Sequence, residues 1–266
     1  MEKIGLIAGF GKLPIAFAKA AARKNISVVA VGIVGEANPE LEKYVDSFYW
    51  ISVGKLDDII KTFTNEKIKE VVMAGAITKT VMFTGIEVDD RVMRILSSLE
   101  DRNDDSLLVA VANEIEREGI AVKDSTTYLG CLLPDEGCLT ARQPTESEMA
   151  DIRFGMKMAK CIGELNIGQT VVVKDLVVLA VEAIEGTDEA IRRGATLGGE
   201  GVVVAKVTKP KQDLRFDLPA VGVTTITIMA EVGASVLAVE AGKTIILEME
   251  KVVDLASSSG ISIVAM

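Results

Sequence analysis

The first half of the chain alternates short apolar runs with amphipathic segments, and this alternation limits the possible folds more than any other feature. Each apolar run is short enough for one buried strand, and the segments between them repeat apolar residues at helical spacing. The predicted strands are 3–8, 27–34 and 70–74, and the predicted helices are about 14–24, 56–65 and 105–118. This β-α-β-α order predicts a parallel, Rossmann-like sheet.

The alternation stops near Thr126, and the second half of the chain is richer in predicted strands. Prolines and a glycine interrupt residues 131–148, which we expect to form a linker. The linker separates a Rossmann-like N-terminal domain, residues 1–130, from a distinct C-terminal α/β domain, residues 149–266, which we expect to be catalytic. Thr145-Glu-Ser-Glu148 is typical of a helix start. Beyond it we expect helices over 151–165 and before 262, and strands over 170–173, 177–184, 201–206, 223–228, 236–239, 244–247 and 262–265.

The acidic charge and the lack of histidine narrow the functions open to this chain. A net charge of −10 argues against nucleic acid as a partner, because such binding relies on a basic surface. Without histidine, Ser-His-Asp and Cys-His mechanisms and His-ligated metal sites are excluded. Any metal chemistry must use oxygen ligands, which favour Mg²⁺, or Mn²⁺ as the alternative, over Zn²⁺.

The sequence predicts a cytoplasmic protein. No apolar run reaches the roughly 18 residues that a membrane span requires. The chain starts with Glu2 and Lys3 and enters a strand at once, which is not typical of a signal peptide. Cys131, Cys138 and Cys161 are spaced as ordinary thiols of a reducing compartment.

A glycine-rich turn follows the first predicted strand. Gly9-x-Gly11-x-x-Pro14 resembles a phosphate-binding turn at a helix N-terminus, and Gly9 and Gly11 are predicted to contact substrate. The alternative is a tight turn that needs glycine for its backbone conformation. Pro14 replaces the third glycine of a dinucleotide-binding fingerprint, so an NAD-dependent oxidoreductase has little support.

The segment Lys209-Pro-Lys-Gln-Asp-Leu-Arg-Phe-Asp-Leu-Pro-Ala-Val-Gly222 interleaves basic and acidic residues between two prolines. A charged surface loop is the simple interpretation. A rigid carboxylate among cations also suits a site that neutralises phosphate and holds a metal or activates water. Asp217 is the predicted catalytic residue and metal ligand. The predicted substrate-binding residues of this segment are Lys209, Gln212 and Arg215.

A second polar segment follows the predicted strand 177–184. Glu185 is predicted to bind the metal with Asp217, and Thr187 and Asp188 to bind substrate, because phosphates bind where strands end and helices begin. The structural alternative is a β-turn in which Asp188 caps the next helix.

Five motifs together resemble the UDP-2,3-diacylglucosamine pyrophosphatase family of the lipid A pathway, of the LpxI type. They are Gly-x-Gly-x-Leu-Pro (9–14), Asp-Ile-x-x-Gly (151–155), Asn-Ile-Gly-Gln-Thr-Val-Val-Val (166–173), Val-Leu-Ala-Val-Glu-Ala-Ile-Glu-Gly-Thr-Asp (178–188) and Lys-Pro-x-Gln-Asp-x-Arg-x-Asp-Leu-Pro-x-Val-Gly (209–222). Asn166 departs from the pattern, which has aspartate before Ile-Gly-Gln. The similarity runs along the whole chain.

The resemblance implies a hydrolase that uses Mg²⁺ and water to cleave UDP-2,3-diacylglucosamine into UMP and 2,3-diacylglucosamine 1-phosphate (lipid X). It implies two α/β domains that hold the lipid between them, and it makes Asp217 the required aspartate. The expected partner is the UDP-linked glycolipid. Peripheral contact with the inner membrane surface and a homodimer stay open. Alternatives are a nucleotide- or lipid-binding protein without hydrolytic activity and the NAD-dependent oxidoreductase.

Overall fold

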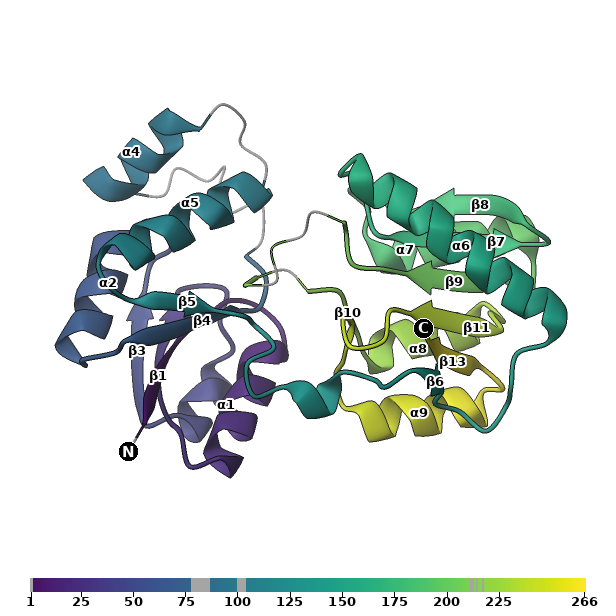
Figure 1. The fold of residues 1–266 in the computed structure, drawn as a ribbon, viewed down its shortest axis with the longest axis horizontal. Helices are drawn as coiled ribbons and strands as arrows, with labels where there is room; N and C mark the ends of the chain where they lie inside the picture. Colours follow the sequence, from purple (N-terminus) through teal and green to yellow (C-terminus); the bar gives the residue numbers. More distant parts are fainter. Residues whose placement is uncertain (1, 78–86, 100–103, 211–212, 214, 217) are drawn as a thin grey trace. The chain divides into compact units, whose positions relative to one another are not determined.

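The computed structural model describes residues 2–77, 87–99, 104–210, 213, 215–216 and 218–266, and it divides into two compact units. The N-terminal unit comprises Met1–Leu129 together with Asp213–Asp217, and the C-terminal unit comprises Gly130–Gln212 and Leu218–Met266. Figure 1 shows that each unit has its own sheet. The predicted fold class is confirmed: a parallel sheet in the N-terminal part and a separate mixed sheet in the C-terminal part.

The N-terminal sheet has five parallel strands in the order β3-β2-β1-β4-β5. The strands are β1 (Lys3–Ala8), β2 (Ser27–Ile33), β3 (Ser47–Ile51), β4 (Glu70–Ala74) and β5 (Ala121–Lys123). The helical elements are α1 (Leu13–Arg23), η1 (Pro39–Tyr44), α2 (Leu56–Asn65), α4 (Asp90–Ser98) and α5 (Asp104–Arg117). The strands and helices predicted here are confirmed in type, whereas β3, β5, α4 and η1 were not predicted.

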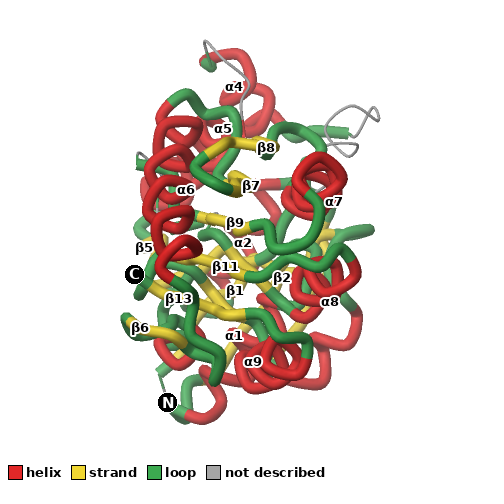
Figure 2. The backbone as a smooth tube through the Cα atoms, turned by 90° about the vertical axis from the view of Figure 1, so that its right-hand side faces the viewer, coloured by secondary structure: helices red, strands yellow, loops and turns green. Residues whose placement is uncertain are grey.

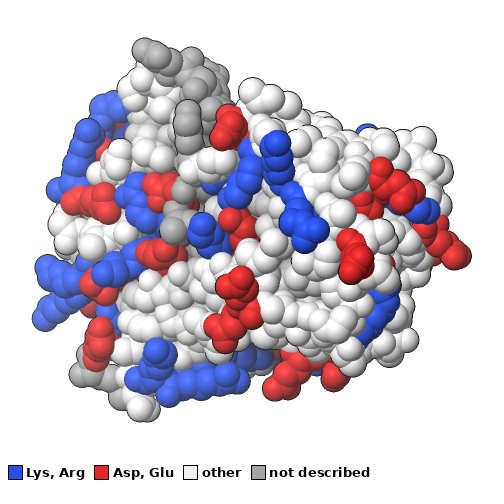
Figure 3. Space-filling model, turned by 45° about the vertical axis from the view of Figure 1, so that its right-hand side comes forward, with Lys and Arg blue, Asp and Glu red and all other residues white. Residues whose placement is uncertain are grey.

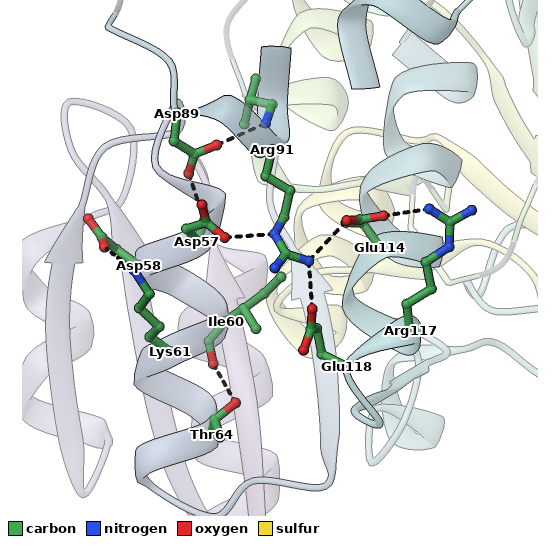
Figure 4. A network of polar contacts seen from close by, with 11 residues as sticks. Asp57, Asp58, Ile60, Lys61, Thr64, Asp89, Arg91, Glu114, Arg117 and Glu118 are labelled. Carbon is green, nitrogen blue, oxygen red and sulfur yellow. Dashed lines mark hydrogen bonds and ion pairs between the residues drawn. The ribbon is translucent and has the colours of Figure 1, made fainter. Parts of the chain in front are cut away.

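A polar network ties three helices of the N-terminal unit together (Figure 4). Arg91 of α4 donates to Asp57 of α2 at 2.7 Å, to Glu114 of α5 at 2.9 Å and to Glu118 at 2.8 Å. Asp89 caps α4 through the amide of Val92 and also accepts from the amide of Asp57. One guanidinium thus satisfies three carboxylates, which fixes α4 against the helices that cover the sheet.

The C-terminal sheet has six strands in the order β6-β13-β11-β9-β7-β8. Its centre is parallel, because β11 pairs in parallel with both β9 and β13, while β7 runs antiparallel to β8 and β9. The strands are β6 (Gly137–Cys138), β7 (Thr170–Lys174), β8 (Val177–Val181), β9 (Val203–Lys206), β11 (Val236–Val239) and β13 (Ser262–Ala265). A separate short pair joins β10 (Ala220–Val221) to β12 (Ile245–Ile246).

Helices cover both faces of the C-terminal sheet, as Figure 2 shows. On one face α6 (Glu146–Glu164) buries Ile152 and Ala159 against the strands. On the other face lie α7 (Thr187–Gly198), α8 (Val223–Glu231) and α9 (Met249–Ser258), whose apolar side chains share a second core. The predicted helix start at Thr145 is confirmed, because its hydroxyl and the Glu148 carboxylate form a capping box.

Residues 223–228 were predicted as a strand, and this prediction is wrong, since they lie in α8. The sequence Val-Thr-Thr-Ile-Thr-Ile is rich in β-branched residues, which favour strands by local preference. Tertiary packing decides otherwise, because Ile226 and Met229 lie three positions apart and are both fully buried in the same core. A short 3-10 turn, η2 (Gly130–Leu132), precedes β6.

Two surface properties bear on the sequence predictions. Among the described helices, none is both long and apolar enough to span a bilayer. On the face drawn in Figure 3, basic and acidic side chains are interspersed and form no single basic surface.

Candidate active site

Polar side chains gather at one edge of the C-terminal sheet. The parallel strands β8, β9 and β11 end there, at Val181, Lys206 and Val239. The antiparallel strand β7 begins at the same edge, since Thr170 pairs with Lys206. The carboxyl ends of parallel strands are where open α/β sheets bind ligands. We call this side of the sheet the carboxyl edge.

A buried lysine and a buried glutamate are joined through a threonine at the carboxyl edge. Lys206 and Glu182 are 6% and 9% exposed. The Lys206 ammonium donates to the Thr187 hydroxyl oxygen at 2.7 Å, and that hydroxyl donates to Glu182 Oε1 at 2.8 Å. Buried charges need partners of this kind, because isolated charges are costly away from water. Thr187, a predicted site residue, therefore lies in a fixed polar cluster.

Gln169 adds an unsatisfied group to this cluster. Its backbone amide lies 3.4 Å from Glu182 Oε2. Its side-chain oxygen Oε1 is buried and accepts no hydrogen bond from any part of the chain that the structure describes. A buried acceptor without a donor calls for a water or a ligand.

Asp188 is half-buried in the first turn of α7, and it does not cap the helix. The N-cap is Gly186, whose φ of 84° suits glycine, and no side chain among the described residues accepts from the first amides of α7. Burial raises the pKa of Asp188, and the nearby Lys206 opposes this rise. Within the described ranges, no group donates a hydrogen bond to the Asp188 carboxylate, so it can accept one from a ligand.

Glu185 already has partners in this structure. Its carboxylate accepts from the Arg193 guanidinium and from the amide of Ala183. Its own backbone amide and then Arg193 hold the pKa of Glu185 below its ordinary value. A metal ion at Glu185 would have to compete with Arg193.

The sequence did not predict the second polar cluster at the carboxyl edge. The Glu240 carboxylate accepts from Lys160 at 2.7 Å and from the amide of Thr208 at 2.6 Å. Lys160 also donates to the carbonyl of Thr208 at 2.8 Å. Burial favours a higher pKa for Glu240, but Lys160 and the Thr208 amide outweigh it and lower the pKa. Thr208 is held on both sides of its backbone, directly before the charged segment that begins at Lys209.

Lys209 joins two of the motifs that are distant in the sequence. Its ammonium donates to Asn166 Oδ1 at 2.9 Å. Its backbone lies against Gly163, where an added Cβ would come within 3.3 Å of the Lys209 Cα. Asn166 has a φ of 54° and ends the turn after α6. Asparagine tolerates this left-handed backbone conformation, and its side-chain oxygen accepts the hydrogen bond from Lys209.

The middle of the charged segment belongs to the N-terminal unit. The Arg215 guanidinium donates to both carboxylate oxygens of Asp213 and, at 3.3 Å, to Glu116 of α5. Phe216 is 5% exposed and belongs to the N-terminal core. Gln212 and Asp217 lie outside the described residues.

Both glycines of the first turn have a structural reason to be glycine. A Cβ on Gly9 would lie 2.3 Å from the carbonyl oxygen of Ala76, because Phe10 and Ala76 form a β-bridge between this turn and the segment after β4. Gly11 has φ of 106°, which side chains rarely allow, although the space around it is open. Close packing and backbone conformation thus account for both glycines, and their contact with substrate stays a prediction.

The described residues contain no group of three or more carboxylates or thiols placed to hold a metal ion. The donor chemistry still suits magnesium, since the edge offers carboxylate and hydroxyl oxygens and the chain has no histidine. Mg²⁺ is usually held by one or two carboxylates together with substrate phosphates, so a complete protein cage is not required.

The fold and site define a two-unit α/β protein with a polar site at the carboxyl edge of its C-terminal sheet. The chain belongs to the LpxI family: residues 3–132 match the LpxI N-terminal domain and residues 135–264 match the LpxI C-terminal domain. It is 34% identical over 273 residues to the UDP-2,3-diacylglucosamine pyrophosphatase LpxI of Caulobacter vibrioides, covering 98% of this chain and 96% of that protein. The family predicted from the motifs is confirmed.

Two solved structures resemble parts of the chain weakly. The biotin carboxylase domain of the Hydrogenobacter thermophilus 2-oxoglutarate carboxylase aligns with 66% of this chain and 36% of its own, at 15% identity and a TM-score of 0.30. Phosphoribosylglycinamide synthetase of Anaerococcus prevotii aligns with 72% of this chain and 34% of its own, at 13% identity and a TM-score of 0.28. This chain thus spans about a third of the length of either protein, and TM-scores this low support no inference about function.

Proposed function

We propose that this chain is a hydrolase that cleaves the pyrophosphate of UDP-2,3-diacylglucosamine, releasing UMP and 2,3-diacylglucosamine 1-phosphate. The observation that carries the proposal is the 34% identity, over 98% of the chain, to the Caulobacter vibrioides protein named for this substrate. The family models extend the match through both halves of the chain.

Asp217 is the residue to which we assign the activation of water. It lies in the Arg-Phe-Asp-Leu-Pro sequence, and the chain offers no histidine for the task. A positioned general base typically contributes about 10²–10⁴-fold to the rate. In the same proposal Lys209, Gln212 and Arg215 bind the pyrophosphate, as do the glycine turn and the start of α7. The predicted catalytic domain, residues 149–266, contains these C-terminal residues in sequence, although Asp213–Asp217 fold with the N-terminal unit.

The polar clusters of the carboxyl edge support this assignment. Lys206 places a buried positive charge beside the N-terminus of α7, whose first amides have no side-chain cap. Helix N-termini and cations both favour bound phosphate. Asp188 and the Gln169 side-chain oxygen are acceptors that a sugar hydroxyl or a metal-bound water would satisfy.

A hard divalent cation is the second part of the proposal. Mg²⁺, or Mn²⁺ in its place, would neutralise the charge of the pyrophosphate when bound. Asp217 is the proposed protein ligand, and substrate phosphates complete the coordination. Glu185 stays a predicted ligand, and Arg193 is the group it would have to release.

One assay tests the proposal. Purified chain is incubated with UDP-2,3-diacylglucosamine, and UMP is measured with Mg²⁺, with EDTA, and with EDTA followed by excess Mg²⁺. Hydrolysis that depends on the cation supports the whole proposal, whereas binding without UMP release supports the non-hydrolytic alternative. The oxidoreductase alternative would be supported only if the chain reduced NAD and released no UMP.

The location and assembly of the protein are part of the proposal as well. We assign it to the cytoplasm, where its lipid-linked substrate is reached at the surface of the inner membrane. Co-sedimentation with vesicles of the same lipids tests the membrane contact, and analytical ultracentrifugation tests the predicted homodimer.

A further inference from the structure

The charged segment 209–222 returns to the N-terminal unit for residues Asp213–Asp217, although the residues on either side belong to the C-terminal unit. The upstream side is fixed at Thr208 by Glu240 and Lys160. The downstream side is fixed where Ile245 donates to the carbonyl of Pro219 at 2.8 Å. Contacts of Asp213, Arg215 and Phe216 hold this part of the segment in the N-terminal unit.

An Asx turn begins the return. The Asp213 carboxylate accepts from the amide of Arg215 at 3.0 Å, and the Asp213 carbonyl accepts from the amide of Phe216 at 3.2 Å. The Arg215 guanidinium closes the turn by binding the same carboxylate and then reaches Glu116. This arrangement directs residue 216 toward the N-terminal core.

Phe216 is the apolar contact that secures the turn. It is 5% exposed and shares a cluster with Ile115 of α5 and Val122 of β5. The Arg215 guanidinium lies 5.3 Å from the centre of the Phe216 ring, so the ion pairs and the buried ring support each other. A segment that was only a charged surface loop would not bury a phenylalanine in the core, so the burial of Phe216 argues against that simple interpretation.

We propose that Phe216 is a positioning residue: its side chain packs in the N-terminal core, and it is the residue directly before Asp217 in the chain. This inference rests on the proposed function, which assigns the activation of water to Asp217. Phe216 acts only through its neighbour and touches neither the substrate nor the reacting atoms. Small errors in the placement of a catalytic group reduce turnover strongly, by up to about 10²-fold.

The test uses three variants of the full chain: Phe216→Ala, Phe216→Leu and the control Ile95→Ala. Ile95 of α4 is 7% exposed in the same core, so its truncation also removes a buried side chain from that core. We expect Phe216→Ala to lower kcat about 10- to 100-fold with KM within about threefold of the unmodified chain. Phe216→Leu should restore most of the turnover, and Ile95→Ala should keep it.

Trypsin gives a readout that does not depend on activity. The bond after Arg215 becomes cleavable when the segment leaves the core, and mass spectrometry detects the new end at residue 216. We expect Phe216→Ala to accelerate this cleavage at least about tenfold, because proteolysis follows the population of the open form. Ile95→Ala should not accelerate it.

Unchanged cleavage after Arg215 in Phe216→Ala would show that the Phe216 ring does not hold the segment in the N-terminal core. Two other results would show that the packing of Phe216 does not position the catalytic group. One is faster cleavage with unchanged kcat, and the other is an equal loss of kcat in Ile95→Ala. Absence of UMP release by the unmodified chain would overturn the proposed function, and with it the role of Phe216 in turnover.

Discussion

The ammonium nitrogen of Lys206 lies 2.7 Å from the hydroxyl oxygen of Thr187, where β9 ends and α7 begins. Through that hydroxyl, Lys206 is coupled to the buried carboxylate of Glu182. The sequence shows Lys206 only as the last residue of an apolar strand, yet its side chain is almost fully buried. It links the start of α7 to the centre of the sheet.

Replacing Lys206 tests whether this cluster serves the proposed site. Lys206→Met removes the ammonium that donates to the Thr187 hydroxyl of the buried cluster, which we expect to cost about 1–3 kcal/mol of unfolding free energy. We also expect turnover to fall by about 10²-fold. Urea unfolding and UMP release measure the two effects.

Lys174→Met is the matched control. Lys174 lies at the opposite end of β7 and donates to the carbonyls of Gly198 and Glu200. Its loss should leave turnover intact. Equal turnover in both variants would show that Lys206 has a purely structural role.

The close approach between Gly9 and Ala76 predicts a stability effect in the N-terminal unit. In Gly9→Ala the new methyl group would lie 2.3 Å from a backbone oxygen, so the turn must shift. We expect a loss of about 1–3 kcal/mol of unfolding free energy. Gly130→Ala is the control, since no atom lies within 4 Å of its added methyl group. If Gly9→Ala is as stable as Gly130→Ala, the proposed packing constraint is wrong.

The capping box of α6 predicts a pH-dependent stability. Burial favours a higher pKa for Glu148, but hydrogen bonds from Arg142 and the amide of Thr145 outweigh it and lower the pKa to about 2. A carboxylate with a lowered pKa stabilises the fold above its unfolded pKa of about 4.5, and this contribution is lost as pH falls toward 2.

Glu148→Gln should therefore cost up to about 3 kcal/mol of unfolding free energy at pH 7, and progressively less between pH 5 and pH 2. Glu146→Gln, an exposed residue of the same first turn, should show little change. A difference between Glu148→Gln and the unmodified chain that stays constant from pH 7 to pH 2.5 would contradict the lowered pKa.

Asp217→Asn tests the assigned catalytic residue directly. The amide keeps the size of the side chain but can neither accept a proton nor hold a cation as a charged ligand. We expect kcat to fall by about 10² or more, with thermal stability unchanged. The kcat of Asp217→Asn is compared with that of Asp213→Asn. Asp213 is a carboxylate of the same segment that binds Arg215, and this pairing lowers the pKa of Asp213. Near-normal turnover of Asp217→Asn would remove Asp217 from the mechanism.

Local patterns predicted much of the fold. The apolar runs that became β1, β2 and β4 are buried throughout or nearly so, and such runs report strands reliably. The prediction failed at α8, where β-branched residues indicated a strand and burial of one helical face decided otherwise. It also missed β3, where Phe48, Tyr49 and Trp50 follow one another and none is fully buried.

The site was less predictable, because its contacts join residues far apart in the sequence. Thr187 and Asp188 could be selected from their place after a strand, and the structure adds Lys206 and Glu182 as their neighbours. No local pattern indicates that Phe216 packs in a core made by residues 7–122. For Lys206, the signal in the sequence was its position as a lysine at the end of an apolar strand.

UMP release from UDP-2,3-diacylglucosamine by the purified, unmodified chain is the most direct test of the proposed function. We predict hydrolysis that EDTA abolishes and that Mg²⁺ or Mn²⁺ restores, because the chain offers oxygen ligands and no histidine. Hydrolysis that persists after exhaustive chelation would contradict the role of the metal. Absence of UMP in the presence of Mg²⁺, with a folded chain and intact substrate, would contradict the proposed hydrolysis itself.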